Sequence, residues 1–254
     1  MTAPRVIGGA TLYQGDAMQV LQSLGLVDAL VTDPPYSSGG LFRGDRMQAP
    51  LDKYIQGGPA QRAVHNANFS GDNRDARSWA FWSSCWLSLA QRLVRPGGYV
   101  MMFTDWRQLP ASTDALQAGG FIWRGLVPWD KTGSARAPHK GYFRHQCEYV
   151  VWGTNGPCPA ATHGGPWPGL VREPVNPREK LHMTGKPVAL MEALVQAVPP
   201  GGVILDPFMG SASTGVAALR AGRRFIGIEQ DAHYFNVACE RLEALGTLAV
   251  QAVA

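Results

Sequence analysis

Short apolar runs alternate along the chain with segments whose apolar residues recur at helical spacing, and glycine or proline separates most of them. The apolar runs predict seven strands, at Thr11 and the residues after it, Ala29–Thr32, Tyr99–Phe103, Phe121–Pro128, Gln146–Trp152, Val203–Leu205 and Arg224–Ile228. The helical spacing predicts helices over Ala17–Leu24, Ser78–Leu93, Ser112–Ala118, Pro187–Val198, Gly215–Ala221 and Ala232–Leu245. Since strands and helices alternate, we expect an α/β fold with a mostly parallel, doubly wound sheet.

The chain of 254 residues is long for one domain of ordinary size and short for two. We therefore expect a single domain over residues 1–254 that carries insertions. Residues 37–77 are rich in Gly, Asn, Asp and Arg, and residues 153–177 in Gly, Pro, Thr and Trp, with little periodicity in either. Loops of this length within a domain are usually functional or disordered.

The helix predicted over 78–93 is rich in aromatic residues. Its apolar residues at helical spacing are Phe81, Trp82, Cys85 and Leu89. Its three tryptophans, Trp79, Trp82 and Trp86, are spaced by three and four residues, which favours core packing or a subunit contact over base stacking.

Composition narrows the class of protein. Hydrophobic residues make up 45% and charged residues 17% of the chain, which indicates a folded globular protein rather than a disordered one. No apolar run is long enough for a signal peptide or a membrane span. The four cysteines form no C-x-x-C pair, and with the histidines they give no compact metal-ligand spacing. We therefore expect a cytoplasmic protein with no membrane partner and no metal.

A candidate cofactor site lies in the last third of the chain. The strand 203–205 runs into a loop of small residues, Asp206–Thr214, and the next strand ends at Glu229. In a doubly wound sheet, such a loop lets a nucleoside approach the backbone, and an acid at the tip of the next strand can bind ribose hydroxyls. The loop has neither a Gly-Lys-Ser/Thr sequence nor the full G-x-G-x-x-G pattern, so a ligand without pyrophosphate is favoured. S-adenosylmethionine meets that description.

The tetrapeptide Asp33-Pro34-Pro35-Tyr36 ends an early apolar strand and suits a planar base with an exocyclic amine. The lone pair of such an amine is delocalised into the ring. Hydrogen bonds from the amine to the Asp33 carboxylate and the Pro34 carbonyl would favour the pyramidal, nucleophilic form. The prolines fix the backbone, and Tyr36 can stack on an extruded base with about 1–3 kcal/mol, comparable to the cost of unstacking.

These motifs together resemble the β-class amino-methyltransferases of DNA, in which the catalytic tetrapeptide precedes the cofactor loop. A third segment, His182-Met183-Thr184-Gly185-Lys186-Pro187, is similar to the motif that this family places ahead of that loop. The resemblance extends from about Gly15 to Leu242. It implies a seven-stranded, Rossmann-like methyltransferase fold with DNA-recognition insertions, and it requires that Asp33 and Asp206 converge on one cavity.

The resemblance also implies roles for individual residues. Asp33, Pro34 and Tyr36 would be catalytic. The S-adenosylmethionine site would be formed by Asp16, Ala17, Asp33, Thr184, Lys186, Asp206, Phe208, Gly210, Ser211, Ser213 and Glu229. Two departures from the family pattern are Met183 in place of proline and Ala212 where glycine is common. Ala212 adds a Cβ at a position whose backbone can require a positive φ.

In this family a D-P-P-Y tetrapeptide is associated mainly with adenine, so the resemblance implies an adenine-N6 enzyme, acting alone or beside a restriction nuclease. A cytosine-N4 enzyme is the alternative within the same chemistry. A methyltransferase acting on RNA or a protein amide is less favoured by the motif order. A non-catalytic DNA-binding regulator with a methyltransferase fold is the alternative from another class.

Two segments have the residues needed to bind double-stranded DNA. Residues 131–180 have seven basic and three acidic residues, which accounts for the whole net charge of +4. We expect them to form the target-recognition region, and residues 37–77 to close over the flipped base. The expected phosphate and base contacts are Arg43, Arg46, Lys131, Arg136, Lys140, Arg144 and Arg172. A homodimer is expected because family members often pair.

Overall fold

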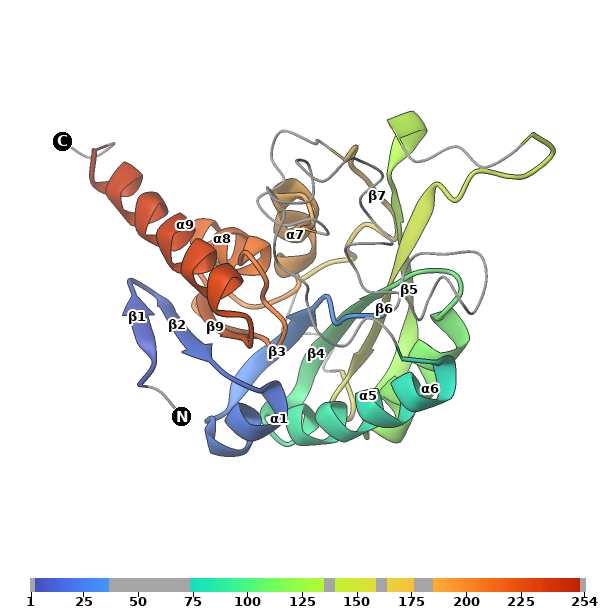
Figure 1. Ribbon diagram of the computed structural model, residues 1–254, viewed down its shortest axis with the longest axis horizontal. Coiled ribbons are helices and arrows are strands. Elements are labelled where there is room, and N and C mark those ends of the chain that lie inside the picture. Colours follow the sequence, from blue (N-terminus) through green and yellow to red (C-terminus); the bar gives the residue numbers. More distant parts are fainter. Residues whose placement is uncertain (1–2, 37–73, 135–139, 159–163, 176–184, 252–254) are drawn as a thin grey trace, which may run out of the picture.

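The computed structural model describes residues 3–36, 74–134, 140–158, 164–175 and 185–251 (Figure 1). These residues form one sheet of nine strands in the spatial order β1-β2-β9-β8-β3-β4-β6-β5-β7. The strands are β1 (Arg5–Ile7), β2 (Ala10–Gln14), β3 (Val27–Thr32), β4 (Val94–Thr104), β5 (Ile122–Asp130), β6 (Cys147–Thr154), β7 (Val171–Arg172), β8 (Val203–Asp206) and β9 (Arg224–Glu229). The helices are α1 (Ala17–Val20), α5 (Ala76–Gln91), α6 (Leu109–Ala118), α7 (Val188–Val195), α8 (Ser213–Arg220) and α9 (Ala232–Gln251), with 3-10 turns η1 (Leu21–Ser23) and η2 (Thr132–Ser134).

The centre of the sheet is parallel and contains its topological switch point. β2, β9, β8, β3 and β4 are neighbours with parallel pairing. From β3 the chain crosses to β4 on one side, and from β8 it crosses to β9 on the other. In open α/β sheets, ligands bind beyond the carboxyl ends of the strands at such a point. The tips of β3 and β8 are therefore the expected location of a site.

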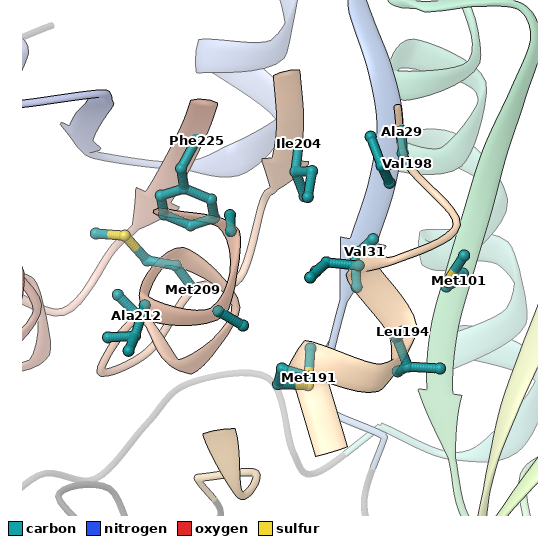
Figure 2. Packing of buried hydrophobic residues seen from close by; sticks show 14 of the residues in the cluster. Ala29, Val31, Met101, Met191, Leu194, Val198, Ile204, Met209, Ala212 and Phe225 are labelled. Carbon is teal, nitrogen blue, oxygen red and sulfur yellow. The ribbon is translucent and has the colours of Figure 1, made fainter. Parts of the chain in front are cut away.

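Helices cover both faces of the sheet. α1, α5 and α6 pack on one face, and α7, α8 and α9 on the other (Figure 1). The side chains of β3 alternate between these two cores. Ala29 and Val31 pack with the residues of α7, as Figure 2 shows, whereas Leu30 faces α5. A parallel strand buried on both faces needs apolar residues at successive positions, which explains why β3 reads as a continuous apolar run.

The structure confirms the α/β class and all seven predicted strands, but the predicted strand count was too low. The two additional strands are β1 and β7, which lie at the two edges of the sheet. β1 pairs with β2 in a hairpin whose turn includes Gly8 at φ +54°, and β7 pairs two residues with the end of β5. Strands of three and two residues are too short to show a period in the sequence.

On α5, the buried residues are not the same set as the apolar residues that recur at helical spacing. Trp79 and Trp86 are fully buried, which confirms core packing, and the buried face also includes Ser83, Leu87 and Ala90. Phe81 is 74% exposed although it belongs to the apolar set. The two large buried tryptophans determine which face of the helix points inward, because indole rings bury more apolar area than other side chains.

The Arg95-Pro96-Gly97-Gly98 segment is part of β4, and its second glycine is required by a close backbone contact. A Cβ on Gly98 would lie 2.5 Å from the Asp28 carbonyl oxygen and 2.9 Å from that of Arg95. We predict that Gly98→Ala lowers the free energy of unfolding by about 1–3 kcal/mol, because backbone atoms cannot yield as a side chain can. Urea denaturation measures the effect. Gly25→Ala, where nothing lies within 4 Å, is the control, and equal stability of the two variants would contradict the prediction.

Candidate active site

The tetrapeptide Asp33-Pro34-Pro35-Tyr36 lies immediately beyond the carboxyl end of β3. Pro34 and Tyr36 are buried, and Asp33 is partly buried with its side chain 20% exposed. The Trp79 indole nitrogen of α5 donates a hydrogen bond to the Pro35 carbonyl at 2.6 Å. The two prolines end the strand, and the buried indole then fixes the direction in which the chain leaves it.

A buried hydrogen bond joins the tetrapeptide to the cofactor loop. Thr32 Oγ1, from the residue before Asp33, donates to Asp206 Oδ1 at 2.7 Å. Thr214 Oγ1 donates to Asp206 Oδ2 at 2.7 Å, and the Phe208 backbone nitrogen donates to Oδ1 at 3.1 Å. Desolvation by burial nevertheless raises the pKa of Asp206 to about 6. Since Leu30 pairs with Leu205 in the sheet, the two motifs lie side by side at the carboxyl ends of adjacent parallel strands.

Asp33 belongs to a network of four alternating charges. Lys186 Nζ donates to Asp33 Oδ2 at 2.6 Å and lies 3.4 Å from Glu148 Oε2, and Lys131 Nζ donates to Glu148 Oε1 at 3.0 Å. The Tyr36 hydroxyl donates to Glu148 Oε2 at 3.2 Å. Two ammonium groups and two carboxylates thus balance one another in a largely buried cluster, as buried charges require.

The network leaves one oxygen of Asp33 available. Asp33 Oδ1 is buried and has no hydrogen-bond partner among the described residues. Burial raises the pKa of Asp33 to about 6, although Lys186 acts in the opposite direction. The pKa of Lys186 is raised above its ordinary value because Asp33 and Glu148 outweigh its burial. An unpaired buried acceptor is costly, and it is the arrangement expected for an atom that binds a ligand's donor.

On the other side of the switch point, Glu229 ends β9 beside the cofactor loop. Its carboxylate accepts hydrogen bonds from the backbone nitrogens of Gly210 at 3.0 Å and Asp231 at 2.8 Å. Burial raises the pKa of Glu229 to about 7. A carboxylate has about four lone-pair sites, so about two remain for hydroxyl donors. The remaining acceptor positions therefore fit the hydroxyls of a ribose.

Residues 15–17, which include Asp16 and Ala17 of the expected S-adenosylmethionine site, lie next to Glu229. The Gly15 backbone nitrogen donates to the Glu229 carbonyl at 3.0 Å. Asp16 caps the first turn of α1 by accepting from the Gln19 backbone nitrogen at 3.1 Å, and Ala17 is buried. The structure therefore brings residues 15–17 next to the cofactor loop and Glu229, although about two hundred residues of chain separate them.

The small-residue loop has the strained position that its sequence indicated. Ala212 has φ +59° and is fully buried. The left-handed conformation costs an alanine roughly 1–2 kcal/mol, and burial of its methyl group offsets about 0.8 kcal/mol of that. The Arg241 guanidinium of α9 holds the same loop, because it donates to the Ser211 carbonyl at 2.9 Å and to Ser213 Oγ at 3.1 Å.

An aromatic cluster covers the start of the cofactor loop. The Phe208 ring lies 5.4 Å from the Trp82 ring and 5.1 Å from the Trp86 ring, measured between centroids. The Arg74 guanidinium lies 4.4 Å from the Trp82 ring centroid. The α5 tryptophans therefore support both motifs, since Trp79 holds the tetrapeptide and the other two pack against the loop.

The expected DNA contacts have different surroundings. Lys140 and Arg144 are exposed in residues 140–146 ahead of β6, which project beyond the sheet (Figure 1). The Arg172 side chain is 71% exposed and pairs with Asp130 at 2.9 Å. Lys131 instead lies in the charge network with its side chain 17% exposed. Arg43, Arg46 and Arg136, and Thr184 of the expected cofactor site, lie outside the described residues.

Four residues that contribute to this geometry were not predicted: Thr32, Glu148, Lys131 in its network role, and Arg241. Thr32 adjoins the tetrapeptide, so its hydroxyl was a detectable signal. Glu148 and Arg241 become visible only when strand pairing and helix packing are known, because each acts on residues far away in the chain.

Comparison with solved structures identifies the fold class. The structure of an M1.HpyAVI–SAM complex matches with a TM-score of 0.66 at 24% identity over 92% of this chain and 98% of that chain. The cytosine-N4-specific PvuII DNA methyltransferase matches with a TM-score of 0.67 at 16% identity over 93% of this chain and 87% of that chain. The chain therefore has the Rossmann-like fold of these methyltransferases.

Comparison of sequences identifies the family. The chain belongs to the N6/N4 DNA methylase family, whose sequence model matches residues 27–240. The type II methyltransferase M2.DpnII of Streptococcus pneumoniae is 29% identical in an alignment of 236 residues that covers 86% of this chain and 83% of that protein. M2.LlaDCHI of Lactococcus lactis subsp. cremoris is 26% identical in an alignment of 253 residues that covers 92% of this chain and 89% of that protein. Among the described residues, no helix is long and apolar enough to cross a membrane.

The hydrogen bond between Thr32 and Asp206 gives a testable prediction. Thr32→Val removes the donor to a buried carboxylate and should cost about 1–3 kcal/mol of stability. The loss should grow from pH 5 to pH 8, because the variant raises the folded-state pKa of Asp206 further and stability is lost as that group ionises. Thr32→Ser keeps the hydroxyl and should show no such growth. Urea denaturation at both pH values measures this, and parallel behaviour of the two variants would contradict it.

Proposed function

We propose that the protein transfers a methyl group from S-adenosylmethionine to the exocyclic N6 amine of an adenine flipped out of double-stranded DNA, within a specific sequence. The observation that carries the proposal is the free oxygen of Asp33, a buried acceptor at the switch point of a DNA methylase fold, beside the cofactor loop. Family membership supports DNA as the substrate.

S-adenosylmethionine would supply an electrophilic methyl group bound to sulfur. Glu229 would accept hydrogen bonds from the ribose hydroxyls, and Asp16 and Ala17 would border the adenine. The cofactor loop would contact the rest of S-adenosylmethionine through Phe208, Gly210, Ser211 and Ser213. Asp206 would hold this loop in place, because its carboxylate already accepts hydrogen bonds from Thr32, Thr214 and the loop backbone.

The chain's own residues would activate the target amine. Asp33 Oδ1 would accept a hydrogen bond from the amine, and the Pro34 carbonyl would accept another, so that the nitrogen lone pair is directed away from the ring. Lys186 would hold Asp33 Oδ2 throughout. As positive charge develops on the nitrogen, the Asp33 carboxylate would stabilise it and then receive the amine proton. Tyr36 would stack on the base.

The DNA would lie across the same edge of the sheet. β5 is parallel to β7 and antiparallel to β6, and its carboxyl end lies at the edge occupied by the tip of β4. The segment after β5 therefore starts beside the site, and Lys140 and Arg144 are exposed there. Cationic side chains in this position would bind phosphates and orient the duplex.

A cytosine-N4 target is the second candidate, favoured by the similarity in fold to the cytosine-N4-specific PvuII enzyme. Both target amines present similar hydrogens to Asp33. The D-P-P-Y tetrapeptide supports adenine, through the family resemblance. A non-catalytic regulator is disfavoured by the unpaired, buried oxygen of Asp33. Such an acceptor destabilises the fold, and a chain that performs no transfer would gain nothing from it.

Incubation of DNA with tritiated methyl donor, followed by digestion to nucleosides, tests the proposal. We predict label in N6-methyladenine. Label in N4-methylcytosine would transfer the proposal to the alternative base, and absence of label from DNA would refute it. Asp33→Ala should lower the transfer rate at least about 100-fold while S-adenosylhomocysteine still binds. Unchanged turnover would remove Asp33 from its proposed role.

The carboxylates predict separate pH dependences for binding and transfer. Glu229 and Asp33 must both be ionised to accept hydrogen bonds, and their pKa values are raised by burial to about 7 and about 6. As the pH falls, the KM for the methyl donor should therefore rise first, below about 7, and kcat should fall below about 6. Steady-state kinetics from pH 5 to 9 measure this. Glu229→Gln should remove the first inflection, and its persistence in that variant would contradict the assignment.

A further inference from the structure

Glu148 is a largely buried carboxylate at the catalytic edge that the reaction as described does not use. It lies near the start of β6, next to the residue that pairs with the last residue of β4. Its side chain is 18% exposed. Buried ion pairs contribute little net stability, so the four-charge cluster needs another explanation than folding.

We propose that Glu148 is a positioning residue for methyl transfer: it holds the Tyr36 hydroxyl and shares the Lys186 ammonium with Asp33, so that Asp33 Oδ1 stays available to the target amine. This inference rests on the proposed function. It assigns to Glu148 a role that acts through two other residues, without contact with the base.

The distances support a shared ammonium. Lys186 Nζ is 2.6 Å from Asp33 Oδ2 and 3.4 Å from Glu148 Oε2. The same ammonium lies 5.5 Å from the Tyr36 ring centroid and 5.1 Å from the Phe103 ring centroid. The aromatic rings limit where the ammonium can lie, and the two carboxylates compete for its charge. Without Glu148, the whole charge of Lys186 would act on Asp33 and weaken it as an acceptor.

Tyr36 is tied to the same carboxylate. Its hydroxyl donates to Glu148 Oε2 at 3.2 Å and lies 3.4 Å from Lys186 Nζ. The ring that would stack on the base is therefore held at its far end by the group that adjusts Asp33. One carboxylate thus links the stacking surface to the hydrogen-bond acceptor.

Lys131 is the second cation, after Lys186, that lowers the pKa of Glu148. It donates to Glu148 Oε1 at 3.0 Å, and together with Lys186 it brings the pKa of Glu148 below its ordinary value despite burial. Lys131 directly follows β5, at the start of the segment with the exposed Lys140 and Arg144. The pair therefore joins this segment to the catalytic network.

Charge removal at either residue gives a test that generic damage would not reproduce. The charged groups facing Asp33 are Lys186, Glu148 and Asp206. Because the negative charge of Glu148 raises the pKa of Asp33, Glu148→Gln should move the lower inflection of the kcat profile to more acidic pH. Lys131→Met removes a positive charge from the cluster, while Lys186 still keeps Glu148 ionised, and should move the inflection to more alkaline pH. Each displacement should be on the order of one pH unit.

The experiment measures methyl transfer at saturating DNA from pH 5 to 9 for the two variants. The control is Glu192→Gln, which changes a partly exposed carboxylate of α7 that pairs with Arg220 and should leave the profile unchanged. Glu148→Gln should lower kcat about 10- to 100-fold with the KM for the methyl donor changed by less than about twofold. If Glu148→Gln fails to fold, Lys131→Met still tests the inference. An alkaline displacement of its inflection would support the inference, and an unchanged or acidic inflection would overturn it.

Displacements in opposite directions would support the inference. Inflections that do not move, or that move in the same direction in both variants, would overturn it. Absence of transfer by the unaltered protein would instead refute the proposed function, so the two failures are distinguishable.

Discussion

The architecture of the site depends on one buried contact, the hydrogen bond from Thr32 to Asp206. It joins the tip of β3 to the tip of β8, two strands from distant parts of the chain that are neighbours in the sheet. From β3 the chain turns to one side and from β8 to the other, so the loops that follow separate and leave the carboxyl ends accessible. The catalytic tetrapeptide and the cofactor loop are adjacent for this reason.

A second constraint is the electrostatic cost of the three acids at this edge. Burial raises the pKa values of Asp33 and Asp206 to about 6 and that of Glu229 to about 7. Hydrogen bonds offset part of the cost at Asp206 and Glu229, and Lys186 offsets part of it at Asp33. Under the proposed function, the remaining capacity to accept hydrogen bonds would serve the methyl donor and the target amine. Perturbed carboxylates that converge at a strand edge are typical of functional sites.

The sequence predicted the fold class, the seven longer strands and the convergence of the two motifs, because apolar periodicity and strand-end chemistry are local signals. It missed β1 and β7, which are too short to show a period, and it did not separate exposed Phe81 from buried Trp79 on one helix. The pairing of Lys131 with Glu148 could not be predicted, because charge counts carry no information on pairing; the expected contact of Lys131 with DNA stays a prediction. The strain at Ala212 was predicted, because a Cβ in a glycine loop is a local conflict.

The central claim is that Asp33 and Glu229 face one ligand cavity that holds the methyl donor between them. A crystal structure of the protein with S-adenosylhomocysteine tests this most directly. We predict ribose hydroxyls on the Glu229 carboxylate and the thioether sulfur directed toward the free oxygen of Asp33. Binding of the ligand away from the tips of β3, β8 and β9 would contradict it.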